Sequence, residues 1–324
     1  MLGDGGWGTT LAIHLHSLGQ HVRWWGAFPE YVKELEQKRE NVKFLPGVRI
    51  PRELCISADL LHAVDSAGLI VLAVPSQYLR VVVRRLKDVS PSEKIWVNVA
   101  KGIERETFKL MSEVVVEELG RVPLAVLSGP NIASEIASLH PASSVVASRD
   151  HLLAADVQKV FMSAGLRIYT STDVTGVELG GALKNPIAVA AGISDGLGFG
   201  ANAKAALITR GIVEMARLGV AMGAKEETFW GLSGLGDLIT TCLAGRNRWF
   251  GEQIGRGRSL SAALSSTPMV IEGVETSTAA VELGRRHGVE LPITEQVHAI
   301  LFHRRSPRKA LQTLMLRTGK AESS

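Results

Sequence analysis

Cysteine is scarce in this sequence, and its placement excludes two kinds of site. Cys55 and Cys242 are the two cysteines among 324 residues. They lie far apart and belong neither to a CxxC motif nor to a Cys/His spacing of the kind that holds a metal ion. The sequence therefore predicts no metal site and a reducing compartment, the cytoplasm.

Long apolar runs and a strong charge of one sign are also missing. No run reaches membrane-spanning length, and no charged segment followed by a short apolar one marks a signal peptide. Lysine and arginine exceed aspartate and glutamate by 36 to 32, a net charge of +4, without a stripe of arginine and aromatic residues. We therefore expect no integral membrane segment, no nucleic-acid partner, and small anions as ligands.

The remaining composition is typical of an α/β protein with many tight turns. Hydrophobic residues make up 46% of the chain and aromatic residues 5%, while glycine occurs thirty-three times. A chain of this length is close to the upper limit for one hydrophobic core, which favours two domains.

The first part of the chain alternates short β-branched runs with helical stretches, as in a parallel sheet with crossover helices. The expected strands are 21–25, 67–74, 94–99, 124–127 and 143–147. Open α/β sheets bind ligands past the carboxyl ends of their strands. Lys101 and Asn131 follow two of these strands closely, so Lys101 is a candidate binding residue, and Asn131 either holds a substrate or caps the next helix.

After Thr172 the strand-like runs give way to helical periodicity. Within 203–219, Leu207, Ile208, Ile212 and Met215 fall on one face, as a buried helix requires. We therefore expect an α/β domain with a mostly parallel sheet over residues 1–172, followed by an all-α domain over residues 173–324.

The first residues, Gly3-Asp4-Gly5-Gly6-Trp7-Gly8, spell GxGxxG directly before an apolar helical run. Glycines at this spacing permit a tight turn, a close approach of the backbone to a pyrophosphate, and close packing of the helix on the sheet. The motif predicts a Rossmann-type nucleotide site, although glycine-rich turns also occur for structural reasons alone. Only Met1 and Leu2 precede it where a strand is expected. Either the first strand is truncated or the start codon is assigned too late.

A lysine in a crowded helix is the candidate for acid/base chemistry. The segment ELGGALKN over 178–185 places small residues in one turn of a predicted helix, with Lys184 directly after them. Crowded apolar surroundings remove water from a lysine and lower its pKa toward neutrality, which suits a general acid or base. The alternative is an ordinary solvated lysine. Pro186 lacks a backbone donor and is expected to kink this helix.

Two further segments combine glycine with polar side chains. GLSGLGDL over 231–238 delivers Asp237, and AGRNR over 244–248 follows it. A carboxylate can orient a hydroxyl or an ammonium group, and the planar guanidinium group of arginine matches phosphate oxygens. Asp237 is equally explained as a turn or cap residue, and Arg248 as a surface charge.

Taken in their order along the chain, these segments resemble the NAD(P)-dependent glycerol-3-phosphate dehydrogenases. The resemblance runs from the first glycine to near the C-terminus. It rests on the strings GDGGWGTTLA, FLPGV, IVLAVPSQ, VAKGIE, LSGPNIASE, ELGGALKN, SDGLGFGANAKAALITRG, LSGLGDLITTC, AGRNR and VIEGVETS.

The resemblance implies reversible hydride transfer between NAD or NADP and dihydroxyacetone phosphate, giving sn-glycerol 3-phosphate for glycerophospholipid synthesis. It makes Lys184 the catalytic acid/base and Lys101 a lysine that touches both substrate and cofactor. The substrate-contacting positions that it adds are Gly129, Asn131, Asp237, Gly245, Arg246 and Asn247, with Arg246 as the phosphate clamp. Beside the motif glycines Gly3, Gly5 and Gly8, the cofactor-contacting positions are Gly6, Trp7, Ala133, Arg246, Val270 and Glu272.

Some positions depart from the family's pattern. Many relatives carry an arginine after the second strand to bind the 2′-phosphate of NADP, whereas Gly26, Ala27 and Phe28 supply neither that cation nor the acidic residue expected for NAD. The choice between NAD and NADP therefore stays open. Asn131 and Gly245 stand where bacterial members commonly have serine. Asparagine keeps a hydrogen-bonding side chain, whereas glycine offers only its backbone.

Two other functions fit parts of the pattern. A reductase of the β-hydroxyacid or 6-phosphogluconate type shares the two-domain plan, but should have a different lysine–asparagine spacing and lack the GLGD and GRN segments. A nucleotide sensor without catalysis is favoured by the truncated first strand alone, and predicts cofactor binding without turnover. The sequence leaves the oligomeric state undecided, with a homodimer as one option.

Overall fold

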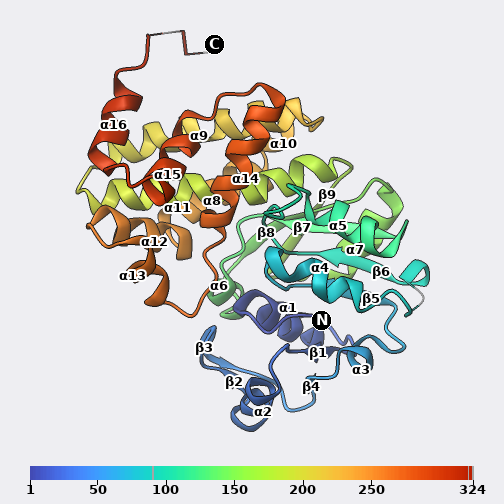
Figure 1. Cartoon of the computed structure of the whole chain (residues 1–324). Coiled ribbons are helices and arrows are strands. Elements are labelled where there is room, and N and C mark those ends of the chain that lie inside the picture. The colour runs from blue at the N-terminus through green and yellow to red at the C-terminus, as the bar shows by residue number, and fades with distance from the viewer. Residues whose placement is uncertain (90, 320, 323–324) are drawn as a thin grey trace.

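The first half of the chain forms a sheet together with the helices that cover it, and the second half forms a bundle of helices (Figure 1). The computed structural model describes residues 1–89, 91–319 and 321–322. The last strand ends at Ser171 and the first helix of the bundle begins at Val174. In Figure 1 the N-terminus lies among the elements of the sheet, and the last helix, α16 (Pro307–Met315), lies on the side of the bundle away from the sheet.

The strands form one mostly parallel sheet with a single bridging residue at its centre. Leu2 pairs in parallel with Trp25 on one side and with Leu72 on the other, and its N–H donates to Val71 O at 2.8 Å. It thereby joins the parallel pair β1–β4 to a five-stranded sheet in the order β5-β6-β7-β8-β9, in which only the β7–β8 pairing is antiparallel. The bounds are β1 (Arg23–Trp25), β4 (Cys55–Ser57), β5 (Leu69–Leu72), β6 (Ile95–Asn98), β7 (Leu124–Ser128), β8 (Ala142–Ala147) and β9 (Leu166–Ser171).

The five strands expected from the sequence are present, and four others were not expected. The unexpected ones are β4, β9 and a small antiparallel hairpin. That hairpin consists of β2 (Glu40–Asn41) and β3 (Leu45–Arg49). The helices of the sheet domain are α1 (Gly6–Ser17), α2 (Pro29–Lys38), α3 (Leu60–Val64), α4 (Ser76–Arg84), α5 (Met111–Leu119), α6 (Ala133–Ala137) and α7 (His151–Phe161), with a short turn η1 (Pro91–Glu93).

Both faces of the sheet are buried because successive side chains of a strand point to opposite sides. On β5, Val71 joins one apolar cluster while Ile70 and Leu72 join the other. On β6, Val97 and Trp96 divide in the same way. The continuous apolar runs in the sequence therefore mark strands that are covered by helices on both faces.

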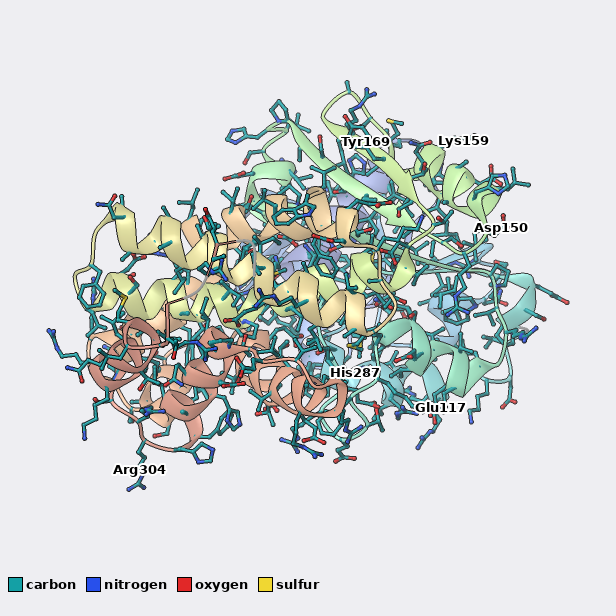
Figure 2. All side chains as sticks on the ribbon, turned by 90° about the horizontal axis from the view of Figure 1, so that it is seen from above. Glu117, Asp150, Lys159, Tyr169, His287 and Arg304 are labelled. Atoms are coloured by element: carbon teal, nitrogen blue, oxygen red, sulfur yellow. The ribbon has the colours of Figure 1, made fainter. Side chains whose placement is uncertain are left out.

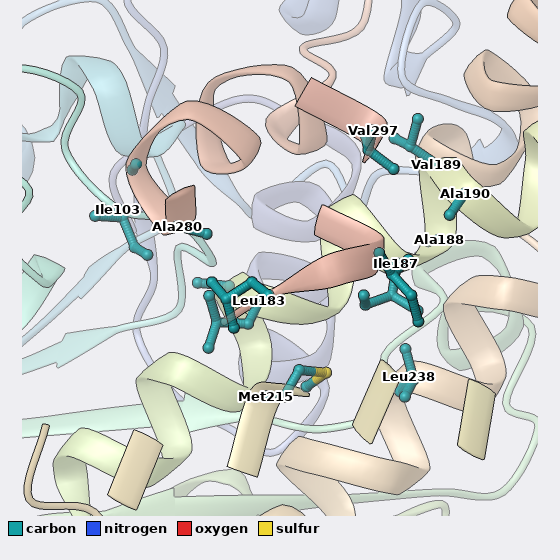
Figure 3. Packing of buried hydrophobic residues seen from close by; sticks show 14 of the residues in the cluster. Ile103, Leu183, Ile187, Ala188, Val189, Ala190, Met215, Leu238, Ala280 and Val297 are labelled. Atoms are coloured by element: carbon teal, nitrogen blue, oxygen red, sulfur yellow. The ribbon is translucent and has the colours of Figure 1, made fainter. Parts of the chain in front are cut away.

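The helical half is organised around α8, a 23-residue helix from Val174 to Gly196. Every residue from 176 to 194 is buried, and the helix continues through Pro186. Its apolar side chains Leu183 and Ile187 pack with Met215 and Leu238 of neighbouring helices (Figure 3). The other helices are α9 (Ala201–Ala221), α10 (Glu226–Phe229), α11 (Asp237–Leu243), α12 (Arg246–Gly255), α13 (Leu260–Ser265), α14 (Glu272–His287), α15 (Pro292–Phe302) and α16 (Pro307–Met315), with one π-helical turn η2 (Leu232–Gly236) before α11.

The periphery of the molecule carries charged side chains. Glu117, Lys159 and Arg304 project outward from both halves (Figure 2). Among the helices that the structure describes, none is both long enough and apolar enough to span a bilayer.

Candidate active site

Lys184 lies in the middle of α8, and its side chain is buried. The residue is 6% exposed, and its ammonium group donates to a carboxylate oxygen of Asp237 and, at 2.7 Å, to Oγ1 of Thr241. The expected crowding is therefore present, and the alternative of a solvated lysine is wrong. Burial lowers the pKa of Lys184 to about 7; the charge of Asp237 opposes this shift, and those of Lys101 and Arg246 add to it.

Asp237 holds two lysines at once. It begins α11, is 2% exposed, and accepts from Lys101 Nζ at 2.7 Å with the oxygen that Lys184 does not use. Lys101 Nζ also donates to the carbonyl oxygen of Gly129, at 2.7 Å. The carboxylate therefore orients ammonium groups, as one reading of the sequence allowed. The arrangement joins one lysine from the end of β6 to another from α8.

Glycines in α8 create the space for this cluster. A Cβ atom on Gly181 would lie 2.6 Å from Ser128 Oγ and 3.4 Å from Lys101 Cγ. A Cβ atom on Gly180 would lie 2.7 Å from the carbonyl oxygen of Ser233, in η2. The small residues of the segment 178–185 therefore let α8 approach both the end of the sheet and the turn that leads into Asp237.

A second hydrogen-bonded chain connects α8 to α12 and α14. Asn185 Nδ2 donates to the carbonyl oxygen of Lys101 at 3.3 Å, and Asn247 Nδ2 donates to Asn185 Oδ1 at 2.8 Å. Asn247 Oδ1 accepts from the N–H of Gly273 at 3.0 Å. The N-terminus of α12 is thereby fixed beside the lysine cluster.

Arg246 is the first residue of α12, and the residue as a whole is exposed. Gly245 precedes it with φ of +105°, a conformation that L side chains rarely adopt. Surrounding protein lowers the pKa of Arg246 by desolvation, and the charge of Glu272 opposes this. Backbone N–H groups and a guanidinium group at a helix N-terminus form a site suited to a phosphate.

Asn131 does not cap the following helix. Its Oδ1 accepts from Ser144 Oγ at 2.6 Å, whereas the cap position of α6 belongs to Ile132 and has no side-chain hydrogen bond. Nδ2 of Asn131 and Oγ of Ser128 are buried without a hydrogen-bond partner among the described residues. Unsatisfied buried donors are uncommon, and here they lie at the end of β7 and just after it, where a ligand is expected.

The glycine turn has the geometry that a pyrophosphate requires. Gly3 has φ of +119°, and a Cβ atom there would lie 2.5 Å from the carbonyl oxygen of Ala73. A Cβ atom on Gly8 would lie 2.3 Å from the carbonyl oxygen of Gly3, so close packing needs the third glycine. Gly5, the N-cap of α1, has no heavy atom within 4 Å of its Cβ position. The backbone is open at the position where the motif brings it against phosphate.

Other predicted cofactor positions lie close to this turn. A Cβ atom on Gly6 would lie 2.6 Å from Phe44 O and 3.8 Å from Cβ of Ala133. Oγ1 of Thr10 donates to the carbonyl oxygen of Ala133 at 3.1 Å. Nε1 of Trp7 is buried without a partner in the described part of the chain. These features fit a dinucleotide on the turn.

Glu272 connects the two halves of the molecule. Its carboxylate accepts from the N–H of Ser76 at 3.1 Å and from Ser76 Oγ at 2.6 Å, at the start of α4. Burial raises the pKa of Glu272, while the hydrogen bonds from Ser76 and the charge of Arg246 act in the opposite direction. A Cβ atom on Gly102 would lie 3.0 Å from Glu272 Oε2, next to Lys101. Val270, two residues earlier, is partly buried, and its cofactor contact stays a prediction.

Sequence reasoning missed three side chains that the structure places in contact with predicted site residues. They are Ser76, Asn185 and Thr241. Asn185 is the last residue of the segment 178–185, and Thr241 lies three residues after the segment 231–238, so these segments were a usable signal for both. Within the described residues no group of histidine, cysteine and acidic side chains could hold a metal ion.

A nucleotide-binding sheet joined to a helical domain with a buried lysine at the junction defines a two-domain NAD(P)-dependent dehydrogenase. The N-terminal part of NAD-dependent glycerol-3-phosphate dehydrogenases matches residues 1–154, and their C-terminal part matches residues 173–312. The chain belongs to the NAD-dependent glycerol-3-phosphate dehydrogenase family.

Individual relatives agree with this assignment. The glycerol-3-phosphate dehydrogenase [NAD(P)+] of Chlorobium phaeobacteroides strain BS1 is 49% identical over 99% of this chain and 98% of its own length. The enzyme of the same name from Geobacillus kaustophilus is 47% identical over 99% and 95%. The crystal structure of glycerol-3-phosphate dehydrogenase from Coxiella burnetii superposes with a TM-score of 0.94 at 39% identity, covering 98% of each chain.

Proposed function

We propose that this chain interconverts dihydroxyacetone phosphate and sn-glycerol 3-phosphate with NAD(H) or NADP(H), and that Lys184 is its acid/base. Family membership supports the reaction. The observation that carries the roles of the residues is the carboxylate of Asp237 held between the ammonium groups of Lys184 and Lys101. This reaction supplies glycerol 3-phosphate for glycerophospholipid synthesis.

Reduction of the ketone requires a hydride at the carbonyl carbon and a proton at the carbonyl oxygen. A bound reduced nicotinamide supplies the hydride. Lys184 Nζ donates the proton, which a pKa near 7 permits at neutral pH. In the oxidative direction the neutral amine takes the proton from the secondary hydroxyl group, so one lysine serves both directions in opposite protonation states.

Lys101 stabilises negative charge on the same oxygen. Its ammonium group is fixed by Gly129 O and Asp237, so it need not reorganise as the carbonyl oxygen gains alkoxide character. Asp237 is a positioning residue for both lysines, and Thr241 accepts a second hydrogen bond from Lys184. The unpaired donor Nδ2 of Asn131 is assigned to the substrate.

The phosphate group of the substrate is assigned to the N-terminus of α12. Gly245 and Asn247 place backbone N–H groups there, and the guanidinium group of Arg246 provides a planar fork for phosphate oxygens. The ion pairs found among the described residues do not include Arg246, although the charge of Glu272 acts on its pKa. It is thus available to an anion.

The dinucleotide is assigned to the turn Gly3–Gly8, with Ala133, Val270 and Glu272 along its path to Lys101. The open Cβ position of Gly5 and the unpaired Nε1 of Trp7 support this assignment. The division into domains at residues 172 and 173 is proposed with it. The change from β9 to α8 at that point supports the division.

The decisive experiment measures turnover and binding separately. The purified chain should consume reduced nicotinamide when dihydroxyacetone phosphate is added and should form sn-glycerol 3-phosphate. A chain that binds the dinucleotide and never oxidises it with this substrate would support the nucleotide-sensor alternative and overturn the proposal.

The two thiols, Cys55 and Cys242, are free, which supports the proposed cytoplasmic location. The homodimer stays a prediction, for which sedimentation of the purified chain is the test.

A further inference from the structure

The loop after β1 lacks the charge that normally selects between NAD and NADP. In dinucleotide-binding folds an acidic residue near the end of the second strand accepts hydrogen bonds from the adenosine ribose of NAD. In NADP-binding members a cationic side chain there binds the 2′-phosphate instead. Here the loop reads Gly26-Ala27-Phe28, and the Phe28 side chain is 69% exposed. The discriminating group must therefore come from another segment or be absent.

Asp4, in the glycine turn, reaches this loop from the opposite side. Its Oδ2 lies 2.7 Å, and its Cγ 3.3 Å, from the position that a Cβ atom on Gly26 would occupy. Gly26 has no positive φ, so the glycine is needed there for space and not for backbone conformation. A larger residue at position 26 would displace the carboxylate. The two residues together place one carboxylate directly beyond β1.

The carboxylate is fixed and incompletely satisfied. Asn41 Nδ2 donates to the backbone carbonyl of Asp4 at 2.8 Å, which holds the turn in place. Oδ2 itself is buried and has no hydrogen-bond partner among the described residues. Burial raises the pKa of Asp4, while the backbone of Asp4 and Ala27 and the charge of Lys43 act in the opposite direction. A buried acceptor without a donor is uncommon unless a ligand completes it.

Lys43 is the neighbouring cation that could favour a phosphate instead. Its ammonium group lies over the ring of Phe44 at 4.9 Å and over that of Tyr31 at 5.5 Å. These contacts point to a lysine held on the aromatic pair beside the turn. The residue directly beyond β1 is therefore faced by the carboxylate of Asp4, whereas the ammonium group of Lys43, whose charge also acts on Asp4, lies on the aromatic pair.

We propose that Asp4 reads the adenosine ribose of the cofactor, accepting hydrogen bonds from its hydroxyl groups and repelling a 2′-phosphate, so that the chain selects NAD(H) over NADP(H). This inference rests on the proposed function, because it concerns the same dinucleotide site. The carboxylate that this fold usually takes from the second strand is here supplied by the turn between Gly3 and Gly5.

The test compares dissociation constants for NADH and NADPH by calorimetry, without substrate, in the unchanged chain and in Asp4→Asn. Asparagine keeps the shape and one acceptor but removes the charge. We expect the unchanged chain to bind NADH at least about tenfold more tightly than NADPH, because like charges in contact are costly. In Asp4→Asn the preference should shrink about tenfold, mainly through tighter binding of NADPH. Adenosine 2′-monophosphate should gain affinity in the same variant, whereas adenosine 5′-monophosphate should not.

Two control variants isolate the effect. Glu36→Gln removes one negative charge from an exposed position on α2 and should leave the preference unchanged, which excludes a long-range charge effect. Lys43→Met tests the alternative, because a large loss of NADPH affinity there would assign the 2′-position to the lysine. Equal affinity of the unchanged chain for both cofactors, or an unaltered ratio in Asp4→Asn while NADH still binds, would overturn the inference. Failure of both dinucleotides to bind the unchanged chain would instead count against the proposed function.

Discussion

The two ends of the proposed site, the glycine turn and the junction of α8 with α11, present different chemical groups to the ligand. At the glycine turn the ligand meets backbone, with an open position at Gly5 and close packing at Gly3 and Gly8. At the junction of α8 and α11 it meets buried charges, Lys184 and Asp237, which are 6% and 2% exposed. Binding a pyrophosphate needs N–H groups and space, whereas moving a proton needs an ionisable group whose pKa the protein has shifted. The comparison predicts that substitutions at one end change binding and those at the other change chemistry.

Removing the amine of Lys184 should have the largest effect. We expect Lys184→Ala to lower kcat by about two to four orders of magnitude, the usual contribution of a positioned acid/base, and to leave the dissociation constant for NADH nearly unchanged. Steady-state kinetics and calorimetry on the same preparation check both halves. Lys159→Ala, an exposed lysine on α7, is the matched control. Near-normal turnover in Lys184→Ala would remove the residue from this role.

Removing the phosphate clamp should affect substrate binding most. Arg246→Ala should raise the KM for dihydroxyacetone phosphate by about 10- to 100-fold, because a charge-assisted hydrogen bond contributes about 1.5–3 kcal/mol. Initial rates across substrate concentrations give this value. Arg167→Ala is the control, because Arg167 lies in β9, stacks on Tyr169 and is not part of the proposed site. It should leave the KM unaltered. An unchanged KM in Arg246→Ala would place the phosphate elsewhere.

Filling the open position of the turn should weaken the cofactor without disturbing the fold. Apart from its chain neighbours, a Cβ atom on Gly5 meets no atom of the described residues within 4 Å, so Gly5→Ala should fold normally, yet the methyl group would occupy space near the pyrophosphate. We expect about a tenfold rise in the dissociation constant for NADH, of the size that a lost phosphate hydrogen bond produces. Gly68→Ala, also with nothing within 4 Å, is the steric control. Equal losses in both variants would contradict this account of the turn.

The shifted pKa of Lys184 predicts opposite pH profiles for the two directions. With a pKa of about 7, the protonated fraction falls about fivefold between pH 7 and pH 8. Reduction, which needs the protonated amine, should lose kcat/KM by that factor, while oxidation should gain as pH rises through the same range. Profiles of kcat/KM with buffers of constant ionic strength test this. Parallel profiles in both directions would show that another group controls the rate.

The smallest expected effect concerns a buried carboxyl group outside the site. Glu214 accepts from the N–H of Ile293 at 2.6 Å and of Thr294 at 3.2 Å, and burial raises its pKa to about 7. The raised pKa of Glu214 contributes stability that is fully present below about pH 4.5, the ordinary pKa of the group, and is lost as the pH rises through about 7. The Tm of the unchanged chain should therefore fall between pH 5 and pH 8, and the fall in Glu214→Gln should be smaller by about 5 °C. Thermal unfolding at both pH values measures the difference, and identical slopes would contradict the prediction.

Local patterns predicted the parts of the molecule that are local in origin. Buried strands are continuous apolar runs, and the turn at Gly3 requires glycine because of its own backbone conformation and the neighbouring chain. The hairpin β2–β3 was missed because its first strand has two residues, too few for any periodicity. The kink at Pro186 stays a prediction, although α8 continues through it.

Long-range geometry could not be predicted from the same patterns. Asp237 meets Lys184 across 53 positions and Lys101 across 136, and no local spacing encodes either contact. Thr241 was missed because a threonine one turn after Asp237 looks like any helical residue until Lys184 is placed beside it. The proximity of Asp4 to Gly26, on which its proposed role rests, was missed for the same reason, because it exists only in three dimensions.

The helix that carries Lys184 also limits how this scaffold can be redesigned. Its turns are enclosed from residue 176 to residue 194, and glycines at 180 and 181 leave no room for a methyl group. Substitutions in α8 that aim to change which carbonyl compounds bind beside Lys184 would therefore cause steric clashes on several sides of the helix. The segment at Gly245 and Arg246 is exposed, with nothing within 4 Å of the Gly245 Cβ position. Variants designed to accept longer or differently charged polyol phosphates should therefore change residues of the segment at Gly245 and Arg246 and leave α8 unchanged.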